Sequence, residues 1–504
     1  MNLEALITLS PALIIVTPLL TAFLKTILEK LFERANKIIF FIGIFVTIFF
    51  VFLMAFRVFT DESWLYIFGA EAPESQAVGS RFRISFLADA YSALAVITIT
   101  IVALASAVYS FDFVKGKDDK KYYTLFLLTL AGANGMVLTQ DLFNLFVWYE
   151  VASVASCGLI VFYNAKGRSI EAGLKYMLLS TVGGLFFLFS IGLFYGQYGV
   201  LNLAILSENI TGTYNDKLAL GLIIGVFAMK SSSVPFHMWT PDAYGEAPGS
   251  STPFIAITTM SSLFVLIRLL FGGLLGSISP QAPGQILLIL GVLSMIIGVG
   301  MALVQDDLKR LVAYLSISQI GFILLAVGLG LISLSSGGFN NYGSTAMRGG
   351  LFHMINDGIY KALLFLSIIS VIYLAGSRSM KNISGMAWKN TGLTIVFIIS
   401  GLCIAAVPPT AGFYSKFLIY KASFLYHPLL GMFTVTISII IFAIMVKIFY
   451  EIFLGPVEIQ EKKQIPRWMN MGMLILTVGV VIFSAIPHII VSEIIIPSIE
   501  ALLL

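Results

Sequence analysis

The sequence predicts an all-α, polytopic membrane protein. Of its 504 residues 58% are hydrophobic and only 11% are charged, and the mean hydropathy is +0.96. Soluble domains of this size carry many more charges. The chain also contains about fourteen apolar runs, each near the roughly 20 residues that a 30 Å hydrocarbon core requires. These runs lie near residues 6–28, 38–60, 84–110, 122–140, 142–162, 173–197, 217–240, 250–274, 285–304, 310–333, 348–374, 392–424, 429–455 and 470–490.

The first run reads as a retained helix because no basic segment precedes it and no small-residue cleavage site follows. Most of the 30 lysine and arginine residues fall in alternate connections on one side of the predicted spans. That side is expected to be cytoplasmic, which places both termini outside the cytoplasm and the protein in the cell (cytoplasmic) membrane. The net charge of +4 is therefore a topology signal and does not indicate a nucleic-acid partner. The longest connection, about residues 61–83, is too short for a soluble catalytic domain.

No cofactor and no metal are expected. The two cysteines, Cys157 and Cys403, fall inside predicted spans and cannot supply the four thiolates of an iron–sulfur cluster. His237 and His353 do not form a pair at matching depth that would ligate haem. Motifs for ATP, dinucleotide or zinc-protease chemistry are absent from the sequence. Any driving energy must then come from an ion gradient or from a partner subunit.

Charged residues inside the predicted spans are the main functional candidates, because ionised groups are costly in hydrocarbon and usually mark an ion path. Glu150 ends the run DLFNLFVWYE, with about ten apolar residues on either side, so it lies roughly 15 Å from each surface. The alternative is a structural salt bridge or hydrogen bond between helices.

Lys230 begins the stretch KSSSVP, in which Pro235 removes a backbone donor and should break the helix near its centre. Broken helices at the midplane tend to line ion sites. A lysine that snorkels to the surface is the alternative, although its mid-span position leaves the side chain too short.

A second proline interruption occurs in GLCIAAVPPTAGFYSKFLIY, where Lys416 follows Pro408 and Pro409. Two interrupted helices, each with one lysine, suggest an internal repeat that pairs the seventh span with the twelfth. The order differs, since lysine precedes proline in the first copy and follows it in the second. We divide the chain into an N-terminal three-helix segment (1–111), a first repeat (112–275), a second repeat (276–456) and a C-terminal helix (457–504).

The eleventh span carries His353, Asp357 and Lys361, whose spacing of four residues places them along one helix face. Histidine, carboxylate and amine in a row form a plausible proton relay. The alternative is a local pair of Asp357 with Lys361.

Arg268 lies towards a helix end, from which it is expected to snorkel. Hydroxyl and amide side chains on the eighth and tenth spans are either packing contacts or water holders between the charged residues. They are Thr258, Thr259, Ser261, Ser262, Tyr314, Ser316, Ser318 and Gln319.

At these positions the chain resembles the antiporter-like subunits shared by Mrp-type cation/proton antiporters, membrane-bound hydrogenase and sulfur-reducing complexes, and respiratory complex I. The resemblance covers roughly residues 85–460. It rests on the blocks DLFNLFVWYE, FAMKSSSVPFHMWTPDAY, QDDLKRLVAYLSISQIGF, FHMINDGIYKALLFL and VPPTAGFYSKF. It implies fourteen helices with two inverted five-helix repeats. It also assigns Glu150 and Lys230 to a buried pair that modulates proton transfer, Lys361 to a central relay position and Lys416 to a terminal one.

Two departures from the family pattern matter. Many members carry histidine or lysine on the eighth helix, where this chain has Thr259, so a link between the half-channels would run through water. The chain also ends soon after the fourteenth helix, without the long lateral helix of the most distal complex I subunit, and it has lysine rather than glutamate at position 416. The resemblance is therefore nearest to the Mrp D-type subunit and its relatives in hydrogenase or sulfur-reducing complexes.

Two functions compete at this point. The first is a proton-translocating subunit, with Na⁺/H⁺ antiport left open, that works beside other membrane subunits of a larger complex. Its path would consist of Glu150, Lys230, His353, Asp357, Lys361 and Lys416. The second is a free-standing secondary transporter of a small solute, since broken helices at the midplane serve such transporters too.

Overall fold

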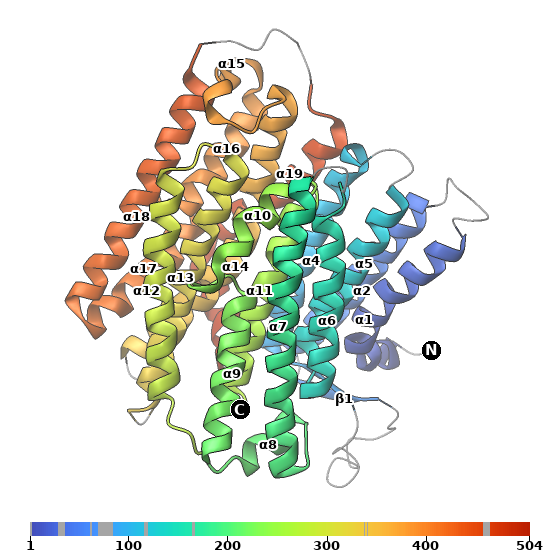
Figure 1. The fold of residues 1–504 in the computed structure, drawn as a ribbon, viewed down its shortest axis with the longest axis vertical. Coiled ribbons are helices and arrows are strands. Elements are labelled where there is room, and N and C mark those ends of the chain that lie inside the picture. Colours follow the sequence, from blue (N-terminus) through green and yellow to red (C-terminus); the bar gives the residue numbers. More distant parts are fainter. Residues whose placement is uncertain are drawn as a thin grey trace.

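The computed structural model describes most of the chain and shows a bundle of long helices (Figure 1). The described residues are 3–28, 36–60, 63–68, 84–114, 119–163, 167–336, 338–339, 341–456 and 464–503. Several of the basic residues that predict the orientation lie outside these ranges, namely Lys30, Arg34, Arg81, Arg83, Lys115, Lys117, Lys166, Lys462 and Lys463.

Within the described residues, eleven helices are long and apolar enough to cross a membrane. They are α1 (Leu3–Leu28), α2 (Asn36–Thr60), α4 (Ala90–Phe113), α6 (Leu142–Ile160), α7 (Gly167–Tyr198), α11 (Thr252–Phe271), α12 (Gln281–Leu303), α13 (Leu308–Leu334), α14 (Asn341–Ala375), α18 (Pro428–Phe449) and α19 (Arg467–Ala485). The remaining three predicted spans coincide with α5 (Asp119–Leu138) and with two helices that are interrupted. The all-α membrane class is confirmed, while the number fourteen stays a prediction.

The two interrupted helices are the ones that the prolines predict. The first consists of α9 (Tyr214–Lys230), a 3₁₀ turn (Phe236–Met238) and α10 (Trp239–Glu246). The second consists of α16 (Thr391–Ile404) and α17 (Ala411–Tyr426). Shorter helical pieces complete the chain: α8 (Leu203–Asn209), α15 (Met386–Lys389), α20 (Pro487–Ile490) and α21 (Ile496–Leu503), with a 3₁₀ turn at Met380–Asn382 and π-helical turns at Tyr450–Leu454 and Val491–Ile495.

Both interruptions have the same backbone structure. After α9, the N–H groups of Ser232 and Ser233 donate to the carbonyls of Met229 and Ala228; after α16, those of Ala406 and Val407 donate to Cys403 and Leu402. This pairing is the Schellman motif that ends a helix. Its left-handed position, usually glycine, is Ser232 (φ 68°) in one helix and Ala406 (φ 56°) in the other.

Each proposed repeat therefore contains one helix that ends in a Schellman motif and resumes after a proline. Ser232 corresponds to Ala406 and Pro235 to Pro409, so the two lysines are not equivalent. Ile404 stands where the first copy has Lys230, and Asp242 on α10 stands where the second copy has Lys416. The repeat boundaries given above remain predictions.

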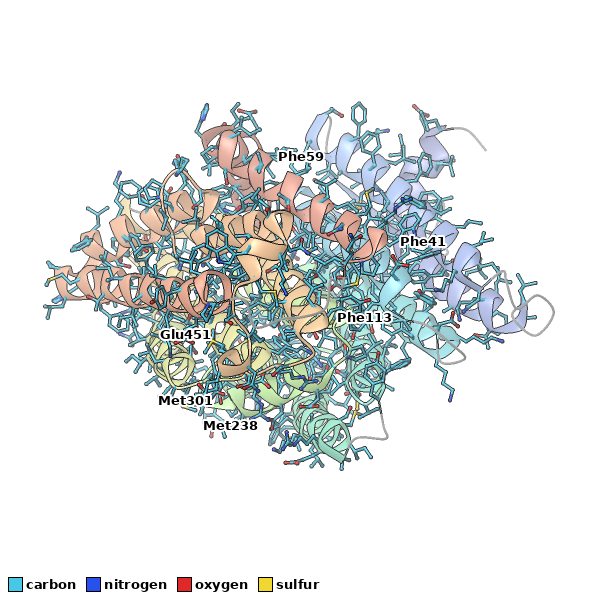
Figure 2. All side chains as sticks on the ribbon, turned by 90° about the horizontal axis from the view of Figure 1, so that it is seen from above. Phe41, Phe59, Phe113, Met238, Met301 and Glu451 are labelled. Carbon is cyan, nitrogen blue, oxygen red and sulfur yellow. The ribbon has the colours of Figure 1, made fainter. Side chains whose placement is uncertain are left out.

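Burial separates central helices from peripheral ones. In their apolar windows, α11 and α13 are buried almost all round, whereas α7, α12 and α18 are buried on one side only. Viewed along the bundle, side chains fill the interior, and Met238 and Met301 lie at its outer edge (Figure 2), where they are exposed. An apolar face that remains exposed on a membrane helix is the face expected to meet lipid or another subunit.

A small β-hairpin, which the sequence analysis did not predict, precedes α4. Strand β1 (Trp64–Ile67) pairs antiparallel with β2 (Ser85–Ala88), Trp64 opposite Ala88 and Ile67 opposite Ser85. Four residues per strand are too few for an alternating pattern to stand out in the sequence. Residues 69–83, the centre of the predicted long connection, lie outside the described residues.

Candidate functional site

Lys230 is the last residue of α9, directly before the first helix interruption, and it is buried. Its Nζ donates hydrogen bonds to the hydroxyls of Ser153 on α6 (2.6 Å) and of Tyr176 (2.7 Å) and Ser180 (3.3 Å) on α7. The same atom lies 4.9 Å from the ring centre of Tyr149 and 4.7 Å from that of Tyr176. Neutral hydroxyls and aromatic rings therefore surround this ammonium group.

Glu150 lies on α6, three residues before Ser153, and is only half-buried. Its carboxylate packs on Gly184 of α7, where a Cβ would lie 2.1 Å from Oε1. Among the described residues no ion pair joins Glu150 to Lys230. The structure thus brings Lys230 to the helix that carries Glu150, where it binds Ser153, three residues further along. Direct coupling of the two charges stays a prediction.

Four of the six predicted path residues come together between α14 and α17, and all four are buried. Asp357 and Lys361 form an ion pair within α14. His353, one turn earlier, has its Nδ1 atom 3.0 Å from the hydroxyl of Ser415, the neighbour of Lys416 on α17. The hydroxyl of Tyr360 donates to Oε1 of Gln319 on α13 (3.4 Å).

Lys416 lies in the second turn of α17, just after the second interruption. Its Nζ donates to the carbonyl oxygen of Ile404, the last residue of α16, at 2.9 Å. It also lies 4.5 Å from the ring centre of Phe322 on α13. The ammonium group therefore binds a carbonyl that the helix end leaves without an intrahelical partner.

Hydroxyl and aromatic side chains occupy the space between the two lysine sites. Tyr176 packs against Trp239 of α10 (ring centres 4.9 Å apart), and Trp239 packs against Tyr244 (6.2 Å). The hydroxyl of Tyr244 lies 3.2 Å from that of Thr259 on α11, and its ring contacts Phe365 of α14. Thr259 is buried and faces this interior. Its hydroxyl also donates to the carbonyl of Ala256 within its own helix (2.6 Å).

Sequence reasoning missed Tyr176, Tyr244, Ser153 and Ser180 because single hydroxyls in apolar helices are usually packing contacts. The position of Tyr244 in the second half of an interrupted helix was the one available signal.

The prediction that Arg268 snorkels to the surface was wrong. It is buried and forms a bidentate pair with Asp89 before α4 (both distances 2.7 Å), with Ser92 as a further acceptor. A charged partner inside the bundle removes the need to reach the surface.

An acidic residue that the sequence analysis did not select, Asp242, links α10 to α7 and α13. Asp242, the counterpart of Lys416, accepts from Lys175 of α7 (2.7 Å) and from Arg310 of α13 (2.6 Å). Glu246, one turn later, pairs with Arg378 (3.0 Å). Asp242, Glu246, Lys175 and Arg310 border a polar cavity of about 750 Å³. A charged cavity thus adjoins the half-helix that follows the first interruption.

A helical membrane bundle with two interrupted helices and buried ionisable side chains at the interruptions has the architecture of ion-translocating membrane proteins. The chain belongs to the family described as NADH:quinone oxidoreductase/Mrp antiporter, transmembrane, whose model matches residues 139–442. This match contains both interruptions and all six predicted path residues.

Similar proteins support the same assignment over a longer range. The D-type subunit of the Na⁺/H⁺ antiporter of Alkalihalophilus pseudofirmus is 30% identical over 390 residues, which cover 76% of each chain. A chain in the structure of the membrane-bound sulfane sulfur reductase, an archaeal respiratory membrane complex, has 26% identity and a TM-score of 0.85, covering 98% of this chain and 97% of that one. A chain of the Mrp complex from a Dietzia species has 22% identity and a TM-score of 0.86, covering 100% and 98%, and so shares the fold.

Proposed function

We propose that this chain is a proton-translocating subunit of a multisubunit ion-pumping membrane complex, either an Mrp-type antiporter or a respiratory assembly of the hydrogenase, sulfur-reductase or complex I kind. The observation that carries the proposal is the series of buried lysines at helix interruptions, with Lys230 at the first, Lys416 at the second and the Asp357–Lys361 pair between them. Buried ionisable groups of this kind are functional by default in membrane helices.

In this proposal a proton enters at Lys230, under the influence of Glu150, and passes by way of the hydroxyls of Tyr244 and Thr259 to Lys361. It then passes to Lys416, with His353 and Ser415 beside the final step. Each lysine acts by accepting and releasing a proton while its neighbours hold the side chain in place. Protons are the proposed cargo. Exchange for Na⁺ is a finer proposal, which rests on the similarity to the Na⁺/H⁺ antiporter of Alkalihalophilus pseudofirmus.

The proposed location is the cell membrane, with the side that carries Lys389 in the cytoplasm and both termini outside. The proposed partners are other membrane subunits, as in the complexes that contain the similar chains. The runner-up, a free-standing transporter of a small solute, is less favoured because the similar structures belong to complexes. Purification in mild detergent separates the two, since a member of a complex co-migrates with other membrane subunits and a free-standing transporter does not.

The central experiment measures proton transport by the purified assembly in liposomes with a pH-sensitive dye. Lys230→Ala and Glu150→Gln should each abolish transport while the assembly stays intact on gel filtration. Lys381→Gln, which removes an exposed ion pair with Asp306 outside the proposed path, serves as the control and should keep most of the rate. Wild-type transport in both path variants would refute the proposal.

A further inference from the structure

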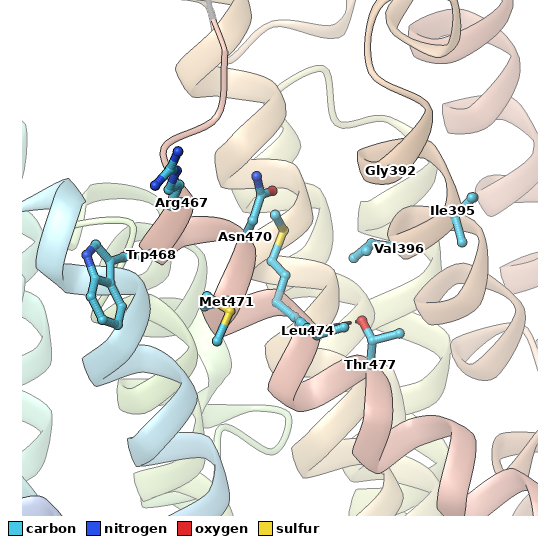
Figure 3. Close-up of a pocket in the computed structure, with 10 residues that line it drawn as sticks. Gly392, Ile395, Val396, Arg467, Trp468, Asn470, Met471, Leu474 and Thr477 are labelled. Carbon is cyan, nitrogen blue, oxygen red and sulfur yellow. Dashed lines mark hydrogen bonds between the residues drawn. The ribbon is translucent and has the colours of Figure 1, made fainter.

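An apolar furrow runs along the seam between α16 and α19 on the outside of the bundle. Its upper part is a cavity of about 800 Å³ lined by α16 at Gly392, Ile395 and Val396 and by α19 from Arg467 to Thr477 (Figure 3). A second cavity of about 310 Å³ follows on the next turns of the same two helices, from Ile399 to Cys403 and from Val480 to Ala485. The two cavities thus lie one after the other along the contact between α16 and α19.

The length of the furrow corresponds to more than one leaflet of a bilayer. From Met471 to Ala485 the helix rises about 21 Å, whereas half of a hydrocarbon core is about 15 Å. Its deep end reaches the second helix interruption, where Pro409 and Thr410 line the cavity. There the hydroxyl of Ser484 on α19 accepts a hydrogen bond from the N–H of Ala411, the first residue of α17 (3.0 Å). The furrow therefore ends against the half-helix that carries Lys416.

The polar groups of the furrow gather at its shallow end. Arg467 and Asn470 lie there in Figure 3, and the lining below them is apolar as far as Thr477. Arg467 is exposed and has no acidic partner in the part of the chain that the structure describes. At the N-terminus of α19, the N–H of Trp468 already donates to Asp112 Oδ2 (3.1 Å), and no anion contact is assigned to that helix end. The guanidinium of Arg467 is thus a cation that stands above an apolar slot.

We propose that this seam, which we call the α16–α19 furrow, binds an anionic phospholipid, with the phosphate at Arg467 and one acyl chain lying along the furrow to the helix interruption. A cation at headgroup level above an apolar slot is the charge pattern that anionic lipids complement. A helix from a partner subunit fits less well. It is 10–12 Å wide, about the spacing of packed helices, and the furrow is a gap between two helices already in contact.

The test uses the full-length chain in its purified native assembly and a phosphatidylglycerol that carries a photoactivatable group on one acyl chain. After illumination, mass spectrometry of peptides should locate the label on residues 391–404 and 467–485. Unlabelled phosphatidylglycerol should compete, whereas phosphatidylcholine and inorganic phosphate should not. This readout involves no transport, so it can fail or succeed independently of the proposed function.

Matched variants sharpen the test. Arg467→Gln should lower labelling about fivefold, as expected for loss of one basic group at the membrane surface. Leu474→Trp and Val481→Trp, which fill the upper and lower cavities, should nearly abolish it. Two controls should label as the wild type does: Lys447→Gln, an exposed lysine at the end of α18, and Ile482→Trp, an exposed residue of α19 that lines neither cavity.

The proposal is overturned if labelling of the furrow is unaffected by Leu474→Trp, or if a photoactivatable phosphatidylcholine labels it equally well. It is also overturned if residues 474 and 481 crosslink to a partner subunit in the native assembly, because the occupant would then be protein.

Discussion

Lys230, Lys361 and Lys416 are all buried, but each meets a different kind of partner. Lys361 has a full counter-charge in Asp357, Lys416 has a backbone carbonyl, and Lys230 has three hydroxyls. In the proposed path, a proton would pass from a lysine bound by hydroxyls to a lysine paired with a carboxylate and then to a lysine at a helix end. The differences among these partners, more than the shared residue type, distinguish the three steps.

Replacing Lys361 with arginine tests whether this residue must release its proton. Arginine keeps the positive charge opposite Asp357 but does not deprotonate in proteins. We expect Lys361→Arg to lose at least about nine-tenths of the proton transport rate in liposomes, nearly as much as Lys361→Ala, while the assembly persists. Lys361→Ala additionally leaves Asp357 buried without its partner, which costs about 3–5 kcal/mol. Full activity of the arginine variant would show that only a fixed charge is needed.

In the proposed path, Thr259 is the residue that links the two lysine sites. Thr259→Val keeps the shape and removes the hydroxyl that faces Tyr244, so the tyrosine hydroxyl loses a partner at a cost of about 1–3 kcal/mol. We expect transport to fall severalfold while the helix stays folded. Thr258→Val is the matched control, because its hydroxyl donates to the carbonyl of Ile255 in its own helix and, unlike that of Thr259, is not paired with the hydroxyl of Tyr244. Equal rates in both variants would exclude a role for Thr259.

At the scale of elements, glycines decide how closely α12 and α13 approach. Gly284, Gly291 and Gly298 recur every seven residues on α12 and face the backbone of α13. A Cβ at Gly291 would lie 2.7 Å from the carbonyl oxygen of Gly321, and one at Gly321 would lie 2.6 Å from that of Gly291. Small residues at such positions let membrane helices pack backbone to backbone. This packing holds α13, which carries Gln319 and Phe322, against the rest of the bundle.

Gly291→Ala should therefore destabilise the protein by about 1–3 kcal/mol, the usual cost of overpacking. Gly300→Ala on the same helix is the control, since a Cβ there has no heavy atom within 4 Å. Thermal unfolding of the purified assembly, followed by fluorescence-detected gel filtration, measures the difference. We expect a lower midpoint for the first variant only. A wild-type midpoint for Gly291→Ala would mean that the two helices can separate without loss.

For the molecule as a whole, orientation in the membrane is the property that follows most directly from charge. The connection after α8 and the short helix α15 lie at opposite ends of the bundle (Figure 1). The excess of basic residues predicts that the α15 end faces the cytoplasm.

Cysteine labelling can establish the orientation. In a background with Cys157→Ser and Cys403→Ser, Glu208→Cys should react with a membrane-impermeant maleimide in intact cells. Lys389→Cys should react only in inverted vesicles. Both positions are exposed in the structure. The opposite labelling pattern would reverse the predicted topology.

Sequence patterns were enough to predict the membrane class, the places where two helices break and four of the buried charged residues, Lys230, Asp357, Lys361 and Lys416. These properties follow from local chemistry, because apolar length, proline and charge act within a few residues of the chain. Family membership was also visible in blocks such as FAMKSSSVPFHMWTPDAY, and the comparisons confirmed it.

The contacts of each charged side chain could be read only from the packed bundle. Sequence spacing could suggest the Asp357–Lys361 pair, because both lie on one helix. It could not place Ser153 and Tyr176 at Lys230, Asp89 at Arg268 or the carbonyl of Ile404 at Lys416. It paired the two interrupted helices and showed that the order of lysine and proline differs between them, but only the backbone motif matches Lys416 with Asp242. Such contacts join helices far apart in the chain, and their geometry depends on how the whole bundle packs.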